Sequence, residues 1–263
     1  MSVTTTTGPV GAVRVHPRMR SRRIEVRRDA GRRRLRRGVV VLSALVALLA
    51  VAAVVRSPLL DVDDLRTQGG EHTSPQRITA AAGIHRGTAM VGLDTEAAES
   101  RVEALPWVAE ATVTRSWPGQ VTVTVEERTP VAAIAVGEAS WAQVDADGRV
   151  LEMVDAAPAG LPALDGVDGR IAQGEPLPGE TGDALDLLAA VHEALPGGIA
   201  AVSTDLDVTL GYGGIVRFGS TDALDDKVVA VETVLARVDL ACMALLDVRA
   251  PGAPALTRHQ GCS

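Results

Sequence analysis

The chain of 263 residues is poor in aromatic side chains, which make up only 2% of it: three Trp, one Tyr and one Phe. Ala, Val and Leu must therefore fill any core, which favours small domains with thin packing layers. Asn is absent and Lys227 is the only lysine beside many Arg. We interpret that bias as genomic base composition. Apolar residues make up 46%, close to the globular average, which argues against wholesale disorder.

No constellation of catalytic or metal-binding residues stands out in the sequence. The five His are scattered, and none has metal-ligand spacing to Cys or to a second His. Neither a Walker-type loop nor a G-x-S-x-G motif is present. The run GYGG at 211–214 predicts a turn, His192 predicts a residue on a helix face, and the acid pairs Asp63/Asp64 and Asp145/Asp147 are typical of turns. We expect no catalytic residues, no metal and no cofactor.

Cysteine is nearly absent, with Cys242 and Cys262 the only two. Two cysteines outside a membrane could form one disulfide. However, Cys242 precedes an apolar strand and Cys262 lies in the C-terminal tail HQGCS, which we expect to be loose. We therefore predict two free thiols.

Acidic residues are scarce at the N-terminus and abundant afterwards. Residues 1–38 contain twelve Arg and only two acids, a formal charge of about +10, whereas the rest of the chain carries −17. A basic segment on an acidic body indicates a contact with either nucleic acid or a membrane.

The segment that follows favours the membrane. Residues 39–55, VVVLSALVALLAVAAVV, contain no charge and one hydroxyl, Ser43. With Gly38 the run reaches eighteen residues, the lower limit for crossing a hydrocarbon core of ~30 Å. Because an Arg cluster abuts its N-terminal side, the tail should be cytoplasmic and residues 57–263 extracytoplasmic. The cluster then acts mainly as a topology signal, and DNA binding is not needed to explain it.

A cleaved signal peptide is the alternative interpretation of this segment. Residues 50–52, Ala-Val-Ala, would pass as a cleavage site, and Arg36-Arg37 resembles a twin-arginine start. The leader would be unusually long, however, and its apolar run exceeds that of a typical signal peptide. We favour an uncleaved signal anchor.

The first part of the outer region predicts two helices on a small sheet. Its expected elements are a strand within 57–69, a helix from the N-cap Ser74 to Gly83, a helix capped by Asp94 and stopped by Pro106, a strand at 108–115, a turn at 117–120 and a strand at 121–125. Two helices covering one face of three strands make a small α+β domain.

The remaining outer region predicts a second, β-rich unit. Its expected elements are a hairpin from 131–136 and 140–145 into RVLEM, irregular structure at 155–180, a helix at 183–195, a hairpin of 199–210 with 214–218, a helix at 221–238, a strand at 243–248 and a short last strand at 255–258. The fold class is therefore α+β, with a C-terminal β domain flanked by helices.

Residues 105–132, LPWVAEATVTRSWPGQVTVTVEERTPVA, resemble the signature of the FtsQ/DivIB family of bacterial cell-division proteins. In that family a helix ends in Leu-Pro-Trp-Val, a strand ends in Arg-x-Trp-Pro, and the next strand ends in Val-x-Glu-Arg-x-Pro. Here Glu126 or Glu127 takes the Glu position. The segments GTAMVGLDT and DDKVVAVETVLARV, and the strand ending at Arg249, also fit. Trp107 and Trp117 of the signature we interpret as core-packing residues.

The resemblance implies a domain organisation and a location. It implies a basic cytoplasmic tail at 1–38, a transmembrane helix at 39–55, a POTRA domain at 57–128, a C-terminal β domain at 129–259 and a flexible tail at 260–263. Such a chain would be a single-pass, type II protein of the cell membrane at the division septum.

The resemblance also implies a non-enzymatic scaffold that recruits or regulates septal peptidoglycan synthesis. Its implied partners are FtsB-like and FtsL-like proteins, the septal synthase complex and the membrane, with no nucleic acid. An FtsB-like partner would add a strand to the last strand, and Arg249 would pair with a partner carboxylate. The implied partner-binding residues are Arg249, Ala250, Ala255, Leu256, Thr257 and Arg258.

This chain departs from the family pattern near that strand. Ala250 stands where the family often has an aromatic residue, and Pro251 and Pro254 crowd the strand. The interface could therefore be shorter or differently placed. The alternatives are an anchored or secreted cell-wall enzyme and a POTRA-type export chaperone, although no barrel-sized β region follows here.

Overall fold

The computed structural model describes residues 35–53 and 60–262, apart from 138, 180, 193, 196 and 197. The chain divides after Leu60 into two units, each considered by itself. Most of the basic tail expected at 1–38 lies outside the described residues.

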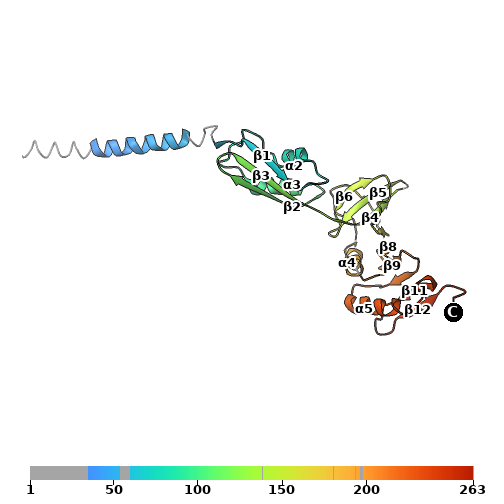
Figure 1. The fold of residues 1–263 in the computed structure, drawn as a ribbon. Coiled ribbons are helices and arrows are strands. Elements are labelled where there is room, and N and C mark those ends of the chain that lie inside the picture. The colour runs from blue at the N-terminus through green and yellow to red at the C-terminus, as the bar shows by residue number, and fades with distance from the viewer. Residues whose placement is uncertain are drawn as a thin grey trace, which may run out of the picture. The chain divides into compact units, whose positions relative to one another are not determined.

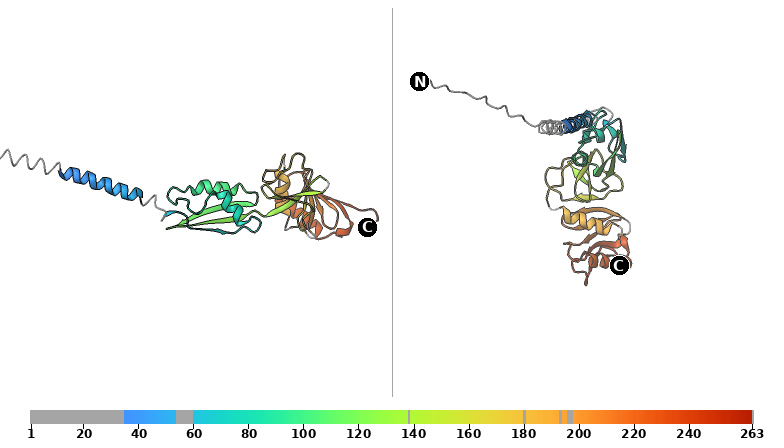
Figure 2. Two further views of the ribbon diagram at one scale, coloured as in Figure 1. Left: turned by 90° about the horizontal axis from the view of Figure 1, so that it is seen from above. Right: turned by 90° about the vertical axis from the view of Figure 1, so that its left-hand side faces the viewer.

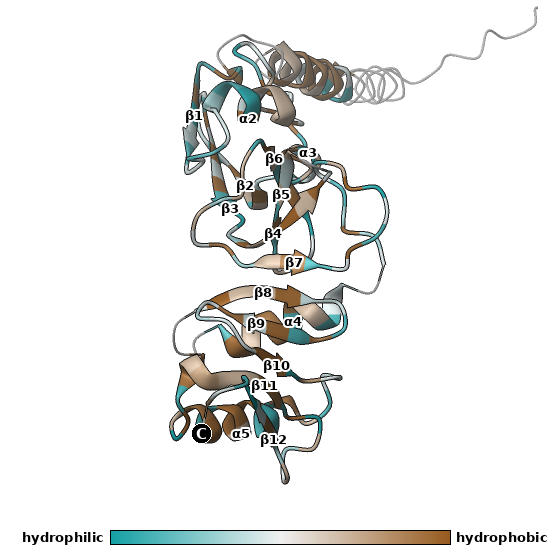
Figure 3. Ribbon diagram, turned by 90° about the vertical axis from the view of Figure 1, so that its right-hand side faces the viewer, coloured by the Kyte–Doolittle hydropathy of each residue, from teal (hydrophilic) through white to brown (hydrophobic). Residues whose placement is uncertain are grey.

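The first unit contains one long apolar helix, Leu35–Ala53. It has 19 residues, and its most apolar stretch of 18 has a mean hydropathy of 2.1 and contains no buried residue. Figure 3 shows the helix as hydrophobic along nearly its whole length. At ~1.5 Å per residue it is about 28 Å long, so it is long and apolar enough to cross a membrane.

The second unit begins with a three-stranded sheet covered on one face by two helices (Figures 1 and 2). The elements are β1 Asp64–Gln68, α2 Pro75–Ala82, α3 Thr95–Glu103, β2 Val108–Ser116 and β3 Gln120–Glu127. The sheet order is β1-β3-β2, with β1 parallel and β2 antiparallel to the central β3. Val121, Val123 and Val125 are buried beneath the helices, as the alternation along β3 predicts.

Local capping explains where the two helices begin and end. The Ser74 hydroxyl accepts a hydrogen bond from the N–H of Arg77, and the Asp94 carboxylate accepts one from the N–H of Ala97. Gly83 ends α2 in the left-handed conformation, at φ 68°, which costs glycine little. These predictions from the sequence are confirmed.

The rest of the second unit is built around a nine-stranded mixed sheet (Figure 1). Its strands are β4 Pro130–Val136, β5 Ser140–Asp145, β6 Val150–Val154, β7 Ala163–Asp165, β8 Ile199–Ser203, β9 Asp207–Leu210, β10 Ile215–Arg217, β11 Met243–Asp247 and β12 Ala255–Arg258, in the order β12-β11-β10-β9-β8-β7-β4-β5-β6. The helices α4 Gly182–Val191 and α5 Leu224–Leu235 touch each other and share one apolar core with the sheet. This agrees with the predicted β domain with flanking helices.

Two predictions for this sheet are wrong. The span 155–180 contains β7, which lies between β4 and β8 and so joins the two halves of the sheet. The strand expected at 199–210 is a hairpin of β8 and β9. Its turn has neither Gly nor Pro, and Leu206 takes the unusual φ of 62°. The preceding Ser203, Thr204 and Asp205 are turn formers that the prediction of one long strand overlooked.

The only lysine of the chain is buried at the start of α5. The Lys227 Nζ donates to the carbonyl of Phe218 at 3.1 Å, and to the carbonyl and hydroxyl of Ser220 at 2.9 and 3.0 Å. Three donors meet three acceptors, which offsets the cost of burying the ammonium group. Lys227 thereby fixes the loop between β10 and α5.

Candidate partner-binding site

The four residues of β12 form the last strand of the nine-stranded sheet. β12 pairs with β11 on one side, and no other strand of the described chain pairs with it. Ala255, Thr257 and Arg258 are exposed, whereas Leu256 is half-buried and packs on the core. The structure thus brings four of the six predicted binding residues onto one exposed edge.

The backbone direction along β12 follows from one hydrogen bond. The N–H of His259 donates to the carbonyl of Cys242 at 3.0 Å, on the β11 side. Because N–H directions alternate along a strand, the N–H of Thr257 points the same way and those of Leu256 and Arg258 point outward. Two of the four residues therefore present backbone donors and acceptors to the edge.

A disulfide closes one end of the β11–β12 pair, so the prediction of two free thiols is wrong. Cys242 and Cys262 are bonded, with their Cα atoms 5.7 Å apart. Cys242 directly precedes β11, and Cys262 follows β12, its N–H donating to the carbonyl of His259. The antiparallel pairing of β11 and β12 brings the thiols together. Strand register was not visible in the sequence.

Arg249 lies just beyond β11 and binds its own chain. Its guanidinium donates to both carboxylate oxygens of Asp247, at 2.6 to 3.0 Å. These hydrogen bonds lower the pKa of the Asp247 carboxyl and raise that of Arg249. A partner carboxylate would therefore either share the Arg249 guanidinium with Asp247 or displace the Asp247 carboxylate from it.

Ala250 follows in an exposed turn between β11 and β12. Pro251 and Pro254 lie in the same connection, outside both strands. The prolines therefore do not interrupt the pairing of β12 with β11.

In the small α+β domain, the signature's Glu is Glu127, whose carboxylate lies against the loop between β1 and α2. Its oxygens accept the N–H of His72 at 3.0 Å, the N–H of Thr73 at 2.9 Å and contact His72 Nδ1 at 2.9 Å. Burial, with the side chain 13% exposed, opposes ionisation, but the hydrogen bonds outweigh it and lower the pKa of the carboxyl. Glu126 is exposed.

The choice between the two Glu could have been made from the alternation along β3. Val121, Val123 and Val125 point to the core, so Glu127 shares their face and Glu126 does not. Gly69 is needed in the loop that Glu127 binds, because a Cβ there would lie 2.1 Å from the carbonyl oxygen of Val125.

The signature's Arg128 connects the small sheet to the large one. Its Nε donates to the carbonyl of Val108 at 2.9 Å, and its Nη1 donates to Asp145 at 2.6 Å and to Asp147 at 3.1 Å. Burial disfavours the charge, but the two carboxylates outweigh this and raise the pKa of Arg128. Asp145 also accepts the N–H groups of Asp147 and Arg149. Asp145 and Asp147 are thus turn residues, as predicted, with an added ionic role.

The two Trp of the signature differ in environment. Trp107 is 7% exposed and stacks on His72, with ring centroids 3.9 Å apart. Trp117 is 56% exposed in the turn between β2 and β3. The packing interpretation holds for Trp107 and is wrong for Trp117.

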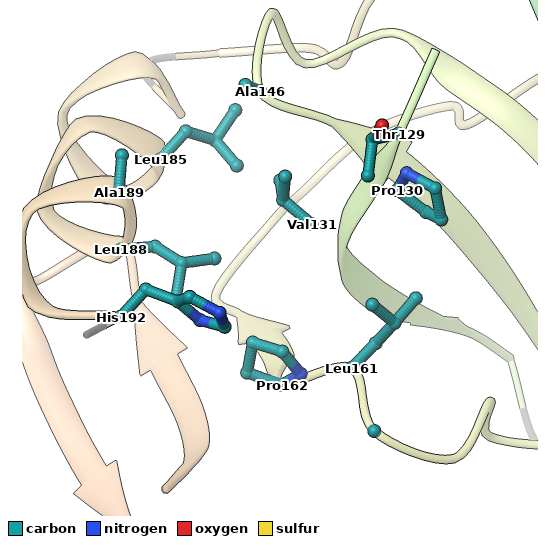
Figure 4. A pocket seen from close by; sticks show the side chains of 11 residues that line it. Thr129, Pro130, Val131, Ala146, Leu161, Pro162, Leu185, Leu188, Ala189 and His192 are labelled. Atoms are coloured by element: carbon teal, nitrogen blue, oxygen red, sulfur yellow. The ribbon is translucent and has the colours of Figure 1, made fainter. Parts of the chain in front are cut away.

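An apolar pocket of about 290 Å³ lies between α4 and the start of β4 (Figure 4). Leu185, Leu188 and His192 face Val131 and Pro162 across it. The described residues that line it supply one imidazole and one hydroxyl, with no carboxylate beside them. Nor do the described residues contain a group of three or more His, Cys, Asp or Glu that could hold a metal ion.

Comparison with known proteins agrees with this architecture. Residues 61–128 match the POTRA domain of FtsQ type. The Cell division protein FtsQ of Streptomyces collinus is 31% identical over 94% of this chain and 98% of its own length. That of Streptomyces griseus is 34% identical over 76% and 99%, and that of Corynebacterium glutamicum 28% identical over 75% and 90%. With this likeness along its length, a POTRA domain and an apolar helix near its N-terminus, the chain belongs to the FtsQ family of cell division proteins.

Proposed function

We propose that this chain is a non-enzymatic divisome scaffold that binds an FtsB-like partner by strand addition to β12. It links cytoplasmic and extracytoplasmic division components and recruits or regulates the septal peptidoglycan synthase, with FtsL-like proteins in the same assembly. The N-terminus is cytoplasmic, residues 57–263 are outside, and the protein acts at the septum. The proposed domain bounds are a tail at 1–38, a transmembrane helix at 39–55, a POTRA domain at 57–128, a β domain at 129–259 and a C-terminal tail at 260–263.

The observation that carries the proposal is the position of β12 at the end of the sheet. An edge strand presents unpaired N–H and C=O groups that another strand can satisfy. The outward groups of Leu256 and Arg258 would give about four hydrogen bonds to an added strand. Since only four residues are available, the contact also needs side-chain contributions, for which Arg249 lies close in the chain.

The disulfide supports this use of the edge. Cys242 and Cys262 flank the paired strands β11 and β12, so β12 is fixed before a partner arrives. Binding to an ordered strand avoids part of the entropy cost of ordering it. A disulfide also suits a domain outside the cytoplasm, in agreement with the proposed topology.

The test compares Arg258→Pro with Arg258→Ala in the full chain, measuring capture of the FtsB-like protein encoded by the same genome. Proline removes the outward N–H without removing a bond to β11, and we expect capture to fall about tenfold. Alanine keeps the backbone donor, and we expect nearly normal capture. Both variants should melt close to the wild-type temperature.

Two results would contradict strand addition at β12. One is normal capture by Arg258→Pro. The other is equal loss in both variants, which would assign recognition to the Arg258 side chain. The wider role is tested separately: a fluorescent fusion to the N-terminus should gather at mid-cell, and the purified full chain should not cleave peptidoglycan.

A further inference from the structure

Trp117 is a large aromatic side chain that the POTRA domain leaves in the open. It is 56% exposed, and Val91, in the loop before α3, is 42% exposed. The chain has only three Trp, and this one would be buried only by a contact outside the domain. Its position shows which contact is within reach.

The turn that carries Trp117 is fixed against the first residues of the domain. The carbonyl of Gly119 accepts the N–H of Asp63 at 2.8 Å and that of Asp64 at 3.1 Å. A Cβ at position 119 would lie 2.9 Å from the Asp61 carbonyl oxygen, so the close approach requires glycine there. Trp117 therefore lies at the end of the domain where the chain enters it.

The loop that carries Val91 is held at the same end. Ala89 forms a β-bridge with Asp61. The guanidinium of Arg115 donates to the carbonyls of Met90 and Leu93, at 3.4 and 3.3 Å. Both exposed apolar side chains thus flank the entry point of the chain.

The entry point is tethered to the apolar helix by a short connection. The helix ends at Ala53 and the domain begins at Asp61, eight residues later. Eight residues span at most about 28 Å when fully extended. If the helix crosses the bilayer, the end of the domain that carries Trp117 stays within that distance of the point where the helix leaves the hydrocarbon core.

We propose that Trp117, with Val91, inserts into the interfacial layer of the outer leaflet and so orients the POTRA domain on the membrane. Trp favours this layer because its ring is apolar and its indole N–H can donate to polar headgroups. The proposal rests on the proposed membrane crossing and is independent of the β12 site.

Charge does not drive this contact. Residues 61–66, 86–94 and 115–120 contribute four acids and three arginines, namely Asp61, Asp63, Asp64, Asp94, Arg66, Arg86 and Arg115. Their formal charges sum to −1, so attraction to anionic lipid should add little. The contact should therefore form on zwitterionic lipid too, and should change little with salt.

The test uses the full chain in phosphatidylcholine nanodiscs, with every Trp replaced by 5-fluorotryptophan. Three Trp give three fluorine resonances, and Trp117→Phe assigns the one of interest. Lipid with a nitroxide near the headgroup should broaden the Trp117 resonance several-fold more than those of Trp107 and Trp141. The difference should persist in anionic lipid and at high salt.

Equal broadening of all three resonances would overturn the proposal. A Trp117 resonance that ignores the nitroxide but shifts when the FtsB-like or FtsL-like protein is added would also overturn it, in favour of a protein contact. Failure of the chain to enter nanodiscs would overturn the membrane crossing as well, and is distinguishable because no spectrum of an embedded chain is then obtained.

Discussion

In the POTRA domain, the side chains of the family signature form hydrogen bonds within the same chain. In contrast, β12 presents backbone N–H and C=O groups that bond to no described part of the chain. Glu127 accepts hydrogen bonds from a neighbouring loop, and Arg128 reaches Asp145 of the large sheet. The exposed residues of β12 form no recognisable motif, yet their backbone is available.

The difference follows from what each region needs from its side chains. An internal carboxylate or guanidinium must have one shape and charge, because leaving its partners unsatisfied costs free energy. Strand addition uses backbone groups, which every residue except proline supplies in full. The most recognisable motif therefore marks how the chain folds, and the proposed binding edge has a weaker pattern.

The largest expected effect concerns the edge. Cys262→Ser removes the disulfide between the residue before β11 and the segment after β12. We expect the free energy of unfolding of the β domain to fall by about 3 kcal/mol. Denaturant unfolding of the oxidised full chain measures this. Cys242→Ser should give the same loss, and the double variant should lose no more than either. If the double variant lost the sum of the two single losses, that result would contradict a disulfide between Cys242 and Cys262.

Arg128→Ala tests the internal role of the signature. The change leaves the buried Asp145 carboxylate without its cation, and because Arg128 is partly exposed we expect a loss of about 2 kcal/mol. The matched control is Asp147→Ala, since that side chain is 83% exposed and should contribute little. Equal urea midpoints for Arg128→Ala and Asp147→Ala would contradict the assignment.

Glu127→Gln should cost about 1 kcal/mol at pH 7, because the amide retains only one acceptor oxygen. The pKa of Glu127 is lowered in the folded state from its ordinary 4.5. Its stabilising effect is therefore complete above pH 4.5 and is lost as the pH falls through the lowered pKa. Melting temperatures of the two proteins should converge in that acid range. A constant gap down to acid pH would contradict the ionic role.

Arg249→Ala should have the smallest effect on folding, with no resolved change in the urea midpoint, because the Arg249 side chain is 61% exposed in its pair with Asp247. If Arg249 contributes to partner binding, capture falls while the melting temperature does not. Arg249→Lys keeps the charge and should restore part of the capture. A large loss of thermal stability would instead show that Arg249 stabilises the fold, as Glu127 and Arg128 are expected to do.

Most elements of the POTRA domain could be predicted from the sequence because they have a local signal, although the first strand, expected within 57–69, lacks clean alternation. Ser74 and Asp94 cap helices, and the Val alternation along β3 gives the buried face. The large sheet was less predictable. β7 has three residues, and the β8–β9 turn relies on Leu206 at positive φ.

For the candidate site, the sequence predicted the strand but not its surroundings. The expected span 255–258 is β12. Its edge position, the Cys242–Cys262 bond and the Arg249–Asp247 pair all depend on which strands lie side by side. Strand order results from long-range packing, which local periodicity does not encode. The exposure of Trp117 was missed for another reason: the residue lies in the turn predicted at 117–120, but the size of its side chain indicated core packing.

Amide hydrogen exchange of β12, with and without the FtsB-like partner, tests the central claim most directly. An added strand would bond the outward N–H groups of Leu256 and Arg258, so both should become protected in the complex, while Glu127 and its neighbours in β3 should not change. If the partner binds and the amides of Leu256 and Arg258 exchange as fast as before, the β12 edge is not the binding site.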